Sequence, residues 1–128
     1  MVTFDEIGVM LDDIADALPD DLFTELNGGI VLLPDTMIHP DSDQEDNLFI
    51  LGEYHEDPMG LGRYITIYYG SFIEVYGQES PEQQMEMLKE ILYHEFRHHL
   101  ESMAGDQELD IKDAIELAEY KQSIKHNN

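Results

Sequence analysis

Hydrophobic positions recur at helical spacing near both ends of the chain and follow strand-like patterns in the region between. Near the amino terminus, Thr3 and Glu6 have the spacing of a capping box, and apolar residues then recur every three or four positions. This pattern predicts a first helix that ends before Pro19. The segment DDLFTELNGG then predicts a short second helix, closed by Gly28 or Gly29.

Three runs of apolar and β-branched residues follow, as is typical of strands. The segment IVLLP predicts a short buried strand, NLFILGEYHED a second strand and RYITIYYGSF a third. The turn PMGLG is short enough to join the last two as a hairpin. The polar segment DTMIHPDSDQED predicts a loop.

The strongest helical pattern begins after Ser80. This serine is a good N-cap, Pro81 suits the first helical position, and Gly105 suits the end of the helix. A last helix is expected from about Ile111, and the tail 122–128 is expected to fray.

The order of these elements predicts one α+β domain. Helices precede and follow a group of strands, and the 128 residues suit a single hydrophobic core. We therefore expect residues 1–128 to form one domain without an internal linker.

The long helix has two different faces. His94, His98 and Glu101 share one stripe, which Met87 and Ile91 continue toward the amino end. We therefore expect this helix to be covered on both sides, with a cleft at one end. The opposite stripe is expected to face the core, with these apolar residues on it or at its edges: Met85, Leu88, Leu92, Phe96, Leu100 and Met103.

The sequence HEFRH within this helix has the H-E-x-x-H spacing of a metal site. His94 and His98 are one turn apart, so both imidazoles can bind one ion from the same side. Zinc bound in this way lowers the pKa of its water, and Glu95 can take a proton from that water as it attacks a carbonyl. The pattern predicts Zn²⁺, or another divalent metal, held by the two histidines, with Glu95 as the general base. The alternative is a histidine-rich helix end in which these side chains make ordinary hydrogen bonds.

Composition narrows the classes of partner. The chain has 29 acidic and 6 basic residues, a net charge of −23, which argues against nucleic acid and anionic membranes as partners. It has no cysteine, so a metal must be held by His, Asp or Glu. Neither a signal peptide nor a long apolar span is recognisable, so a cytoplasmic protein is expected. The acidic charge is explained first by solubility; the alternative is an acidic surface that attracts a basic peptide or protein as substrate.

HEFRHH, late in a chain of this size and after a short sheet, resembles the small bacterial zincin-like metallopeptidases, whose pattern is HExxHxxGxxD. The resemblance implies a zincin-like α+β fold in which a small sheet covers the active-site helix. It also implies zinc ligation by His94 and His98 and catalysis by Glu95. The chain departs from the pattern after the motif, because the Gly position holds Glu101 and the Asp position holds Ala104.

The sequence therefore does not identify the third metal ligand. A carboxylate that returns after Gly105 could reach the ion without strain, and Asp110 is the favoured candidate. Glu101 is the next candidate, although supporting a histidine ligand is an easier role for it along a straight helix. The remaining acidic candidates lie in the expected last helix: Asp113, Glu116 and Glu119.

Several residues outside the motif are candidates for supporting roles. Arg63 could stabilise an oxyanion, as could three tyrosines of the same predicted strand, although packing is the commoner role of strand aromatics. The strand itself could be the edge along which a peptide lies. His99 is expected to pack or cap, and His55 to belong to a turn. The three tyrosines are Tyr64, Tyr68 and Tyr69.

Three functions are consistent with these features. The first is a zinc-dependent metallopeptidase that hydrolyses peptide bonds through a metal-bound water activated by Glu95. The second is a catalytically degenerate zincin that binds metal or a protein partner without turnover. The third, which rests on charge alone, is an acidic interaction module that needs no metal. The sequence does not predict the substrate, the physiological metal or the oligomeric state.

Overall fold

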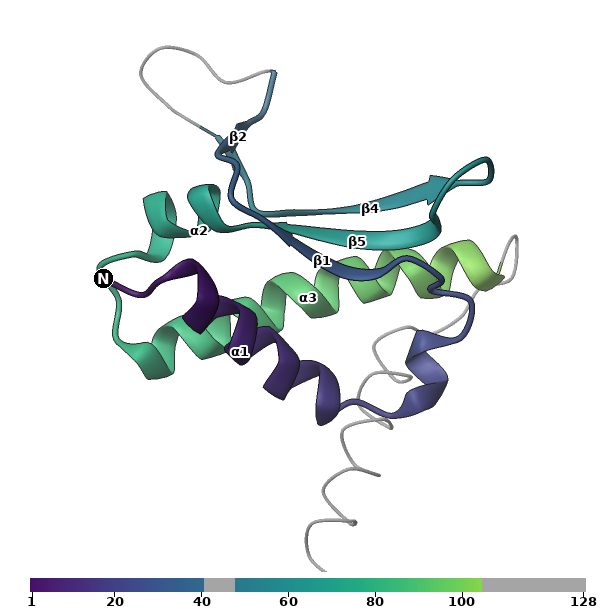
Figure 1. The fold of residues 1–128 in the computed structure, drawn as a ribbon, viewed down its shortest axis with the longest axis horizontal. Helices are drawn as coiled ribbons and strands as arrows, with labels where there is room; N and C mark the ends of the chain where they lie inside the picture. Colours follow the sequence, from purple (N-terminus) through teal and green to yellow (C-terminus); the bar gives the residue numbers. More distant parts are fainter. Residues whose placement is uncertain (41–47, 105–128) are drawn as a thin grey trace, which may run out of the picture.

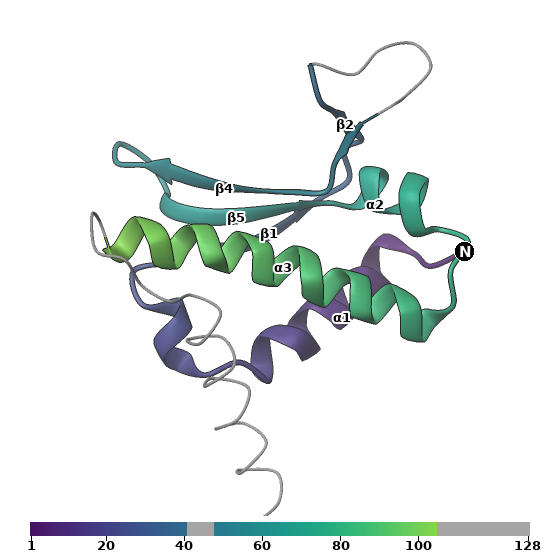
Figure 2. The same cartoon turned by 180° about the vertical axis from the view of Figure 1, so that it is seen from behind.

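The computed structural model describes residues 1–40 and 48–104 of the chain. A three-stranded sheet lies over two helices, α1 and α3, which both cover the same face of it (Figures 1 and 2). In chain order the elements are α1 (Phe4–Asp16), the 3-10 helix η1 (Asp20–Phe23), β1 (Gly29–Leu33), β2 (Met37–Ile38), β3 (Phe49–Ile50), β4 (Gly52–Asp57), β5 (Gly62–Tyr68), α2 (Tyr69–Tyr76) and α3 (Pro81–Ala104).

The three-stranded sheet has the order β1-β5-β4 and is mixed. The predicted hairpin is confirmed, because β4 pairs with β5 antiparallel, with Tyr54 opposite Ile65. β1 pairs with β5 in parallel, with Ile30 opposite Ile65. β5 is therefore the central strand, so the suggestion that RYITIYYG forms a sheet edge for a peptide is wrong. β4 is an edge strand of this sheet instead.

The first helix begins and ends as the sequence predicts. The Thr3 hydroxyl accepts a hydrogen bond from the Glu6 amide, and the Glu6 carboxylate accepts one from the Thr3 amide, each at 3.1 Å. The second helix is shorter than expected. It is a single 3-10 segment capped at Thr24, and the glycines beyond it serve the entry into β1, where Gly29 has a φ of 67°.

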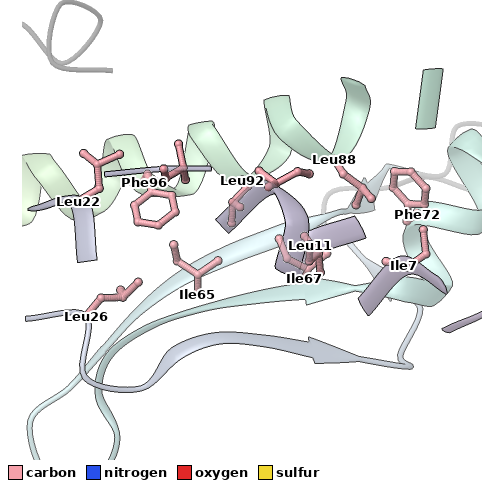
Figure 3. Close-up of a cluster of buried hydrophobic side chains, with 12 residues drawn as sticks. Ile7, Leu11, Leu22, Leu26, Ile65, Ile67, Phe72, Leu88, Leu92 and Phe96 are labelled. Atoms are coloured by element: carbon pink, nitrogen blue, oxygen red, sulfur yellow. The ribbon is translucent and has the colours of Figure 1, made fainter. Parts of the chain in front are cut away.

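The hydrophobic core lies between the sheet and the helices (Figure 3). Ile65 and Ile67 of β5 are fully buried against residues of α1 and α3, including Leu88 and Leu92. The predicted third strand, RYITIYYGSF, is too long: β5 ends at Tyr68, and the last four residues of that segment begin α2, which adds the buried Phe72. Met103, expected in the core, is 37% exposed instead.

Two expectations about the arrangement of the strands are wrong. The segment 48–57 forms two strands, β3 and β4, and β3 pairs with β2, which lies in the segment expected to be a loop. A zincin-like arrangement is also not found, and only the α+β class of that prediction holds. The stripe of α3 that carries the histidines is covered at its amino end, where Met87 and Ile91 are half-buried against the core, and it is exposed at a cleft from His94 onward.

Two glycine substitutions provide a matched test of this packing. A Cβ added at Gly8 in α1 meets only Leu32 Cδ2, at 3.8 Å, so Gly8→Ala should stabilise the chain by up to about 1 kcal/mol through helix propensity. A Cβ added at Gly70 in α2 would lie 2.8 Å from the Asp35 carbonyl oxygen. Gly70→Ala should therefore destabilise by about 1–3 kcal/mol. Urea unfolding measures both, and equal midpoints for the two variants would contradict this packing.

Candidate functional site

A cleft of about 600 Å³ lies between the edge strand β4 and the carboxyl-terminal half of α3. The two elements run alongside each other in the same direction. Gly52 lies against Ile91, and the Glu56 carboxylate accepts a hydrogen bond from the Ser102 hydroxyl further along. The cleft is lined by Gly52, Glu53, Tyr54, Glu56, His94, Glu95, His98, Glu101 and Ser102.

The two histidines of the motif meet at this cleft. Their side chains leave α3 one turn apart, and the two Nε2 atoms lie 3.2 Å from each other. The two nitrogens are at hydrogen-bond distance, so one ring can donate to the other, as in the alternative of a histidine-rich helix end, and both residues are exposed and line the cleft. The structure therefore brings His94 and His98 together as their spacing predicts.

Glu95 lies beside this pair but is buried, with only 5% of its surface exposed. It lines the cleft, and no described residue hydrogen-bonds or ion-pairs with its carboxylate. Burial raises the pKa of Glu95 to about 7, and the negative charge of Glu53 adds to the rise. The cleft thus holds a desolvated carboxylate able to exchange a proton near neutral pH.

Glu53 is a residue of the cleft that sequence reasoning missed. It lies on β4, and the Tyr68 hydroxyl donates a hydrogen bond of 2.5 Å to its Oε1. In the sequence, a glutamate next to a glycine on a predicted strand gives no indication that it belongs to a functional site. Only the pairing of β4 with β5, and the packing of β4 on α3, bring Glu53 near Glu95.

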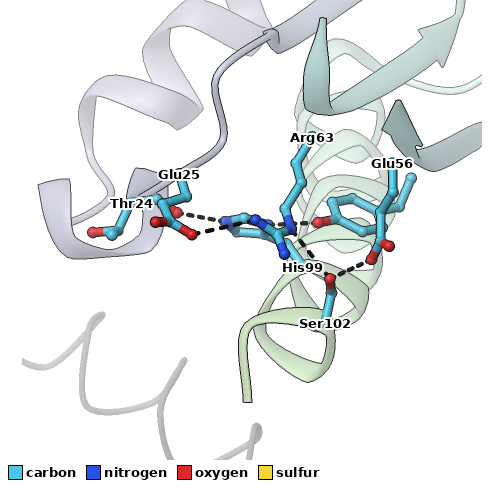
Figure 4. Close-up of polar contacts among 7 residues, drawn as sticks. Thr24, Glu25, Glu56, Arg63, His99 and Ser102 are labelled. Atoms are coloured by element: carbon cyan, nitrogen blue, oxygen red, sulfur yellow. Dashed lines mark hydrogen bonds and ion pairs between the residues drawn. The ribbon is translucent and has the colours of Figure 1, made fainter. Parts of the chain in front are cut away.

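His99 is the third histidine of HEFRHH, and it packs inside the protein as predicted. It is 1% exposed, and burial lowers its pKa, so the ring is neutral. Its Nε2–H donates to the Thr24 carbonyl at 2.8 Å, which leaves Nδ1 to accept from the Tyr54 hydroxyl at 2.8 Å (Figure 4). His99 therefore fixes Tyr54, a lining residue of the cleft, to α3 and to the segment after η1.

The same network holds Arg63, one of the residues considered for oxyanion stabilisation. Its guanidinium donates to Glu25 at 3.2 Å and to the Ser102 hydroxyl at 3.3 Å (Figure 4). Ser102 in turn donates to Glu56, so this chain of contacts joins β4, β5 and α3. Arg63 supports the wall of the cleft and is not among its lining residues.

Tyr64, Tyr69 and His55 make contacts away from the cleft, whereas Tyr68 donates to Glu53, which lines it. Tyr69 donates to the Val2 carbonyl at 2.7 Å, and Tyr64 stacks on His55 with ring centres 4.5 Å apart. The His55 Nε2 also hydrogen-bonds with the Thr66 hydroxyl at 2.9 Å. His55 lies on β4 rather than in a turn. Tyr54 is the tyrosine that lines the cleft, because the edge strand rather than the central strand borders α3.

The third ligand is not found among the described residues. Asp110, the favoured candidate, lies outside them, as do Asp113, Glu116 and Glu119. Within residues 1–40 and 48–104, no group of three or more His, Asp or Glu side chains is arranged to hold an ion. The described part of the cleft thus supplies a pair of histidine nitrogens.

Glu101 is described, and its contacts suit a supporting role. Its Oε2 lies 3.8 Å from Nδ1 of His98, the ring nitrogen that is not paired with His94. Its Oε1 lies 3.6 Å from Nε of Arg97. A carboxylate facing Nδ1 orients a histidine ring and favours the tautomer whose Nε2 is free to bind an ion.

No protein-family model and no curated protein matches the chain. Among solved structures, the chain is similar to a conserved hypothetical protein from Thermo thermophilus, with 31% sequence identity and a TM-score of 0.67. The match covers 82% of this chain and 100% of the other. The expectation of a zincin-like fold is thus replaced by an α+β fold shared with this protein. Among the described residues, no helix is long and apolar enough to cross a bilayer.

Proposed function

Because this chain belongs to the family of the conserved hypothetical protein from Thermo thermophilus, whose description states no activity, we propose its function from the cleft itself. We propose a zinc-dependent peptidase in which His94 and His98 hold the metal and Glu95 is the general base. The observation that carries this proposal is the convergence of the two Nε2 atoms beside a buried carboxylate without a described partner.

The separation of the two nitrogens suits zinc. Zn–N bonds of about 2.0–2.1 Å in a tetrahedral arrangement place two nitrogen ligands about 3.3 Å apart. The Nε2 atoms are 3.2 Å apart, so neither ring has to move far to bind one ion. Two histidines are a partial zinc shell, and Asp110 is proposed to complete it.

Each residue of the proposed site has a separate role in hydrolysis. Zinc, when bound, lowers the pKa of a water molecule and polarises the carbonyl to be attacked. Glu95 accepts the proton of the attacking water, and its raised pKa lets it pass that proton to the departing amine. Glu101, whose Oε2 lies 3.8 Å from Nδ1 of His98, would orient that ring once the distance closes to a hydrogen bond.

A peptide suits the shape of the cleft. β4 is an edge strand of the described sheet and forms one wall, so its backbone can hydrogen-bond an extended chain. A peptide bound along β4 would pass over His94 and His98 on the facing helix. This arrangement supports a peptide bond, rather than a small soluble ester, as the target.

Metal binding is tested directly by substitution of one histidine. The wild-type chain should bind one zinc ion, and His94→Ala should lower the affinity at least about 100-fold because a ligand is lost. Isothermal titration after chelator treatment measures the affinity. His55→Ala is the matched control, because His55 lies on β4 with its ring stacked on Tyr64, and it should leave the affinity unchanged. Equal affinities for wild type and His94→Ala would contradict the proposed site.

Binding without turnover remains the rival proposal. A metal-binding or protein-interaction module would take up zinc at His94 and His98 but would show no hydrolysis with any peptide. The two proposals therefore differ in turnover and not in metal content.

A further inference from the structure

The lining of the cleft is strongly negative. Four glutamates line it, and among the described residues His94 and His98 are its only basic lining residues, since no lysine or arginine contributes to the lining. Arg97 lies near Glu101, but both side chains are about half exposed or more, so water and salt weaken that pair. A ligand that enters this cleft therefore meets a negative potential beside the two histidines.

A second observation points to a ligand in the same place. Glu95 is 5% exposed, it lines the cleft, and it has no hydrogen-bond or ion-pair partner among the described residues. Among the described residues, no fully buried side-chain oxygen lacks a hydrogen-bond partner, so the Glu95 carboxylate reaches the solvent of the cleft. A ligand that enters the cleft can therefore contact this carboxylate directly.

The glutamates are not equivalent along the cleft. Glu53 lies at the end nearer Ile91, and one of its oxygens is held by the Tyr68 hydroxyl. Glu56 lies at the other end, beyond His98, exposed at the rim and steadied by the hydrogen bond from Ser102. Glu56 is therefore the carboxylate best placed to meet a cation that extends from the bond under attack.

We propose that Glu56 makes this cleft select peptides that carry a lysine or arginine next to the cleaved bond. This inference rests on the proposed peptidase function and adds its specificity. The rise of α3 from His98 to Ser102 is about 6 Å, comparable with the reach of a lysine or arginine stem. The cationic head of that side chain would lie beside the Glu56 carboxylate.

The test uses zinc-loaded full-length protein and peptides that differ at one position, which is lysine, arginine, norleucine or glutamate. Mass spectrometry gives kcat/KM for cleavage. The lysine and arginine peptides should exceed the norleucine peptide by about threefold to tenfold, and high salt should shrink the difference. Glu56→Gln keeps the side-chain size and should bring the lysine-to-norleucine ratio close to one. Glu74→Gln, which removes the same charge from the exposed side of α2, should keep the ratio.

The outcomes separate this inference from the peptidase proposal. Cleavage with no preference for lysine over norleucine, or with a preference that Glu56→Gln leaves intact, overturns the inference while the peptidase stands. If no peptide is cleaved, fluorescence anisotropy of the same labelled peptides decides. Tighter binding of the lysine peptide that depends on Glu56 would support the inference and count against turnover. Equal binding of the lysine and norleucine peptides, or no binding of either, overturns the inference.

Discussion

Glu95→Gln is expected to lower kcat/KM for peptide hydrolysis by about 100- to 10,000-fold, because the amide cannot accept the proton of the attacking water. Zinc affinity should stay close to that of the wild type, since the substitution leaves both histidines in place. The folded chain should be at least as stable as the wild type. Burial already raises the pKa of this carboxyl to about 7, so a neutral side chain removes a desolvation cost.

Peptide hydrolysis followed by mass spectrometry, with zinc content measured on the same samples, checks this expectation. Glu90→Gln is the matched control, because Glu90 lies on the same helix but is exposed and does not line the cleft. A Glu95→Gln variant that keeps metal, fold and full hydrolytic activity would show that Glu95 is not the base.

Phe96→Ala is expected to destabilise the chain by about 3–5 kcal/mol, the usual cost of deleting a buried aromatic ring. Phe96 is 1% exposed, and its ring packs edge-on against Phe23, with ring centres 5.2 Å apart. The substitution removes a ring contact between α3 and η1 in the core.

Met103→Ala is the informative comparison for this effect. The hydrophobic pattern places Met103 on the same core stripe as Phe96, but the side chain is 37% exposed in the structure. Removal of the Met103 side chain should lower the free energy of unfolding by no more than about 1 kcal/mol. Chemical denaturation gives both free energies, and similar losses for the two variants would contradict the observed packing of α3.

Local signals explain which parts of the fold the sequence predicts well. The capping box of Thr3 and Glu6, the N-cap and proline at the start of α3, and the hairpin of β4 and β5 each depend on residues close in sequence. The meeting of His94 and His98 follows from helical geometry in the same way. These features can be predicted without knowing how the rest of the chain folds.

Features that depend on distant contacts are the ones that sequence reasoning missed. The parallel pairing of β1 with β5 joins segments far apart in the chain, and the pair of β2 and β3 includes a segment whose polar composition predicts a loop. A search for apolar periodicity also overlooks polar residues that are buried. Glu95 is buried in this way, whereas for His99 the sequence predicts packing and misses only its partners, Thr24 and Tyr54, which come from distant segments.

The same distinction between local and distant contacts applies to the candidate site. The histidine pair and its neighbouring glutamate are readable from five consecutive residues. The roles of Glu53 and Glu56 are not, because they arise only where β4 borders α3. Asp110 stays a prediction for the third ligand, since it lies outside the described residues.

Reversible loss of turnover tests the central claim most directly. The wild-type chain is treated with a chelator, supplied with a broad set of peptides that includes lysine- and arginine-containing sequences, and then titrated with Zn²⁺ or Co²⁺. The account predicts that cleavage disappears on chelation, returns as one equivalent of metal is bound, and does not return in His94→Ala at the same metal concentration. Cleavage that persists in the metal-free chain, or a chain that binds metal at His94 and His98 and cleaves no peptide, would contradict it.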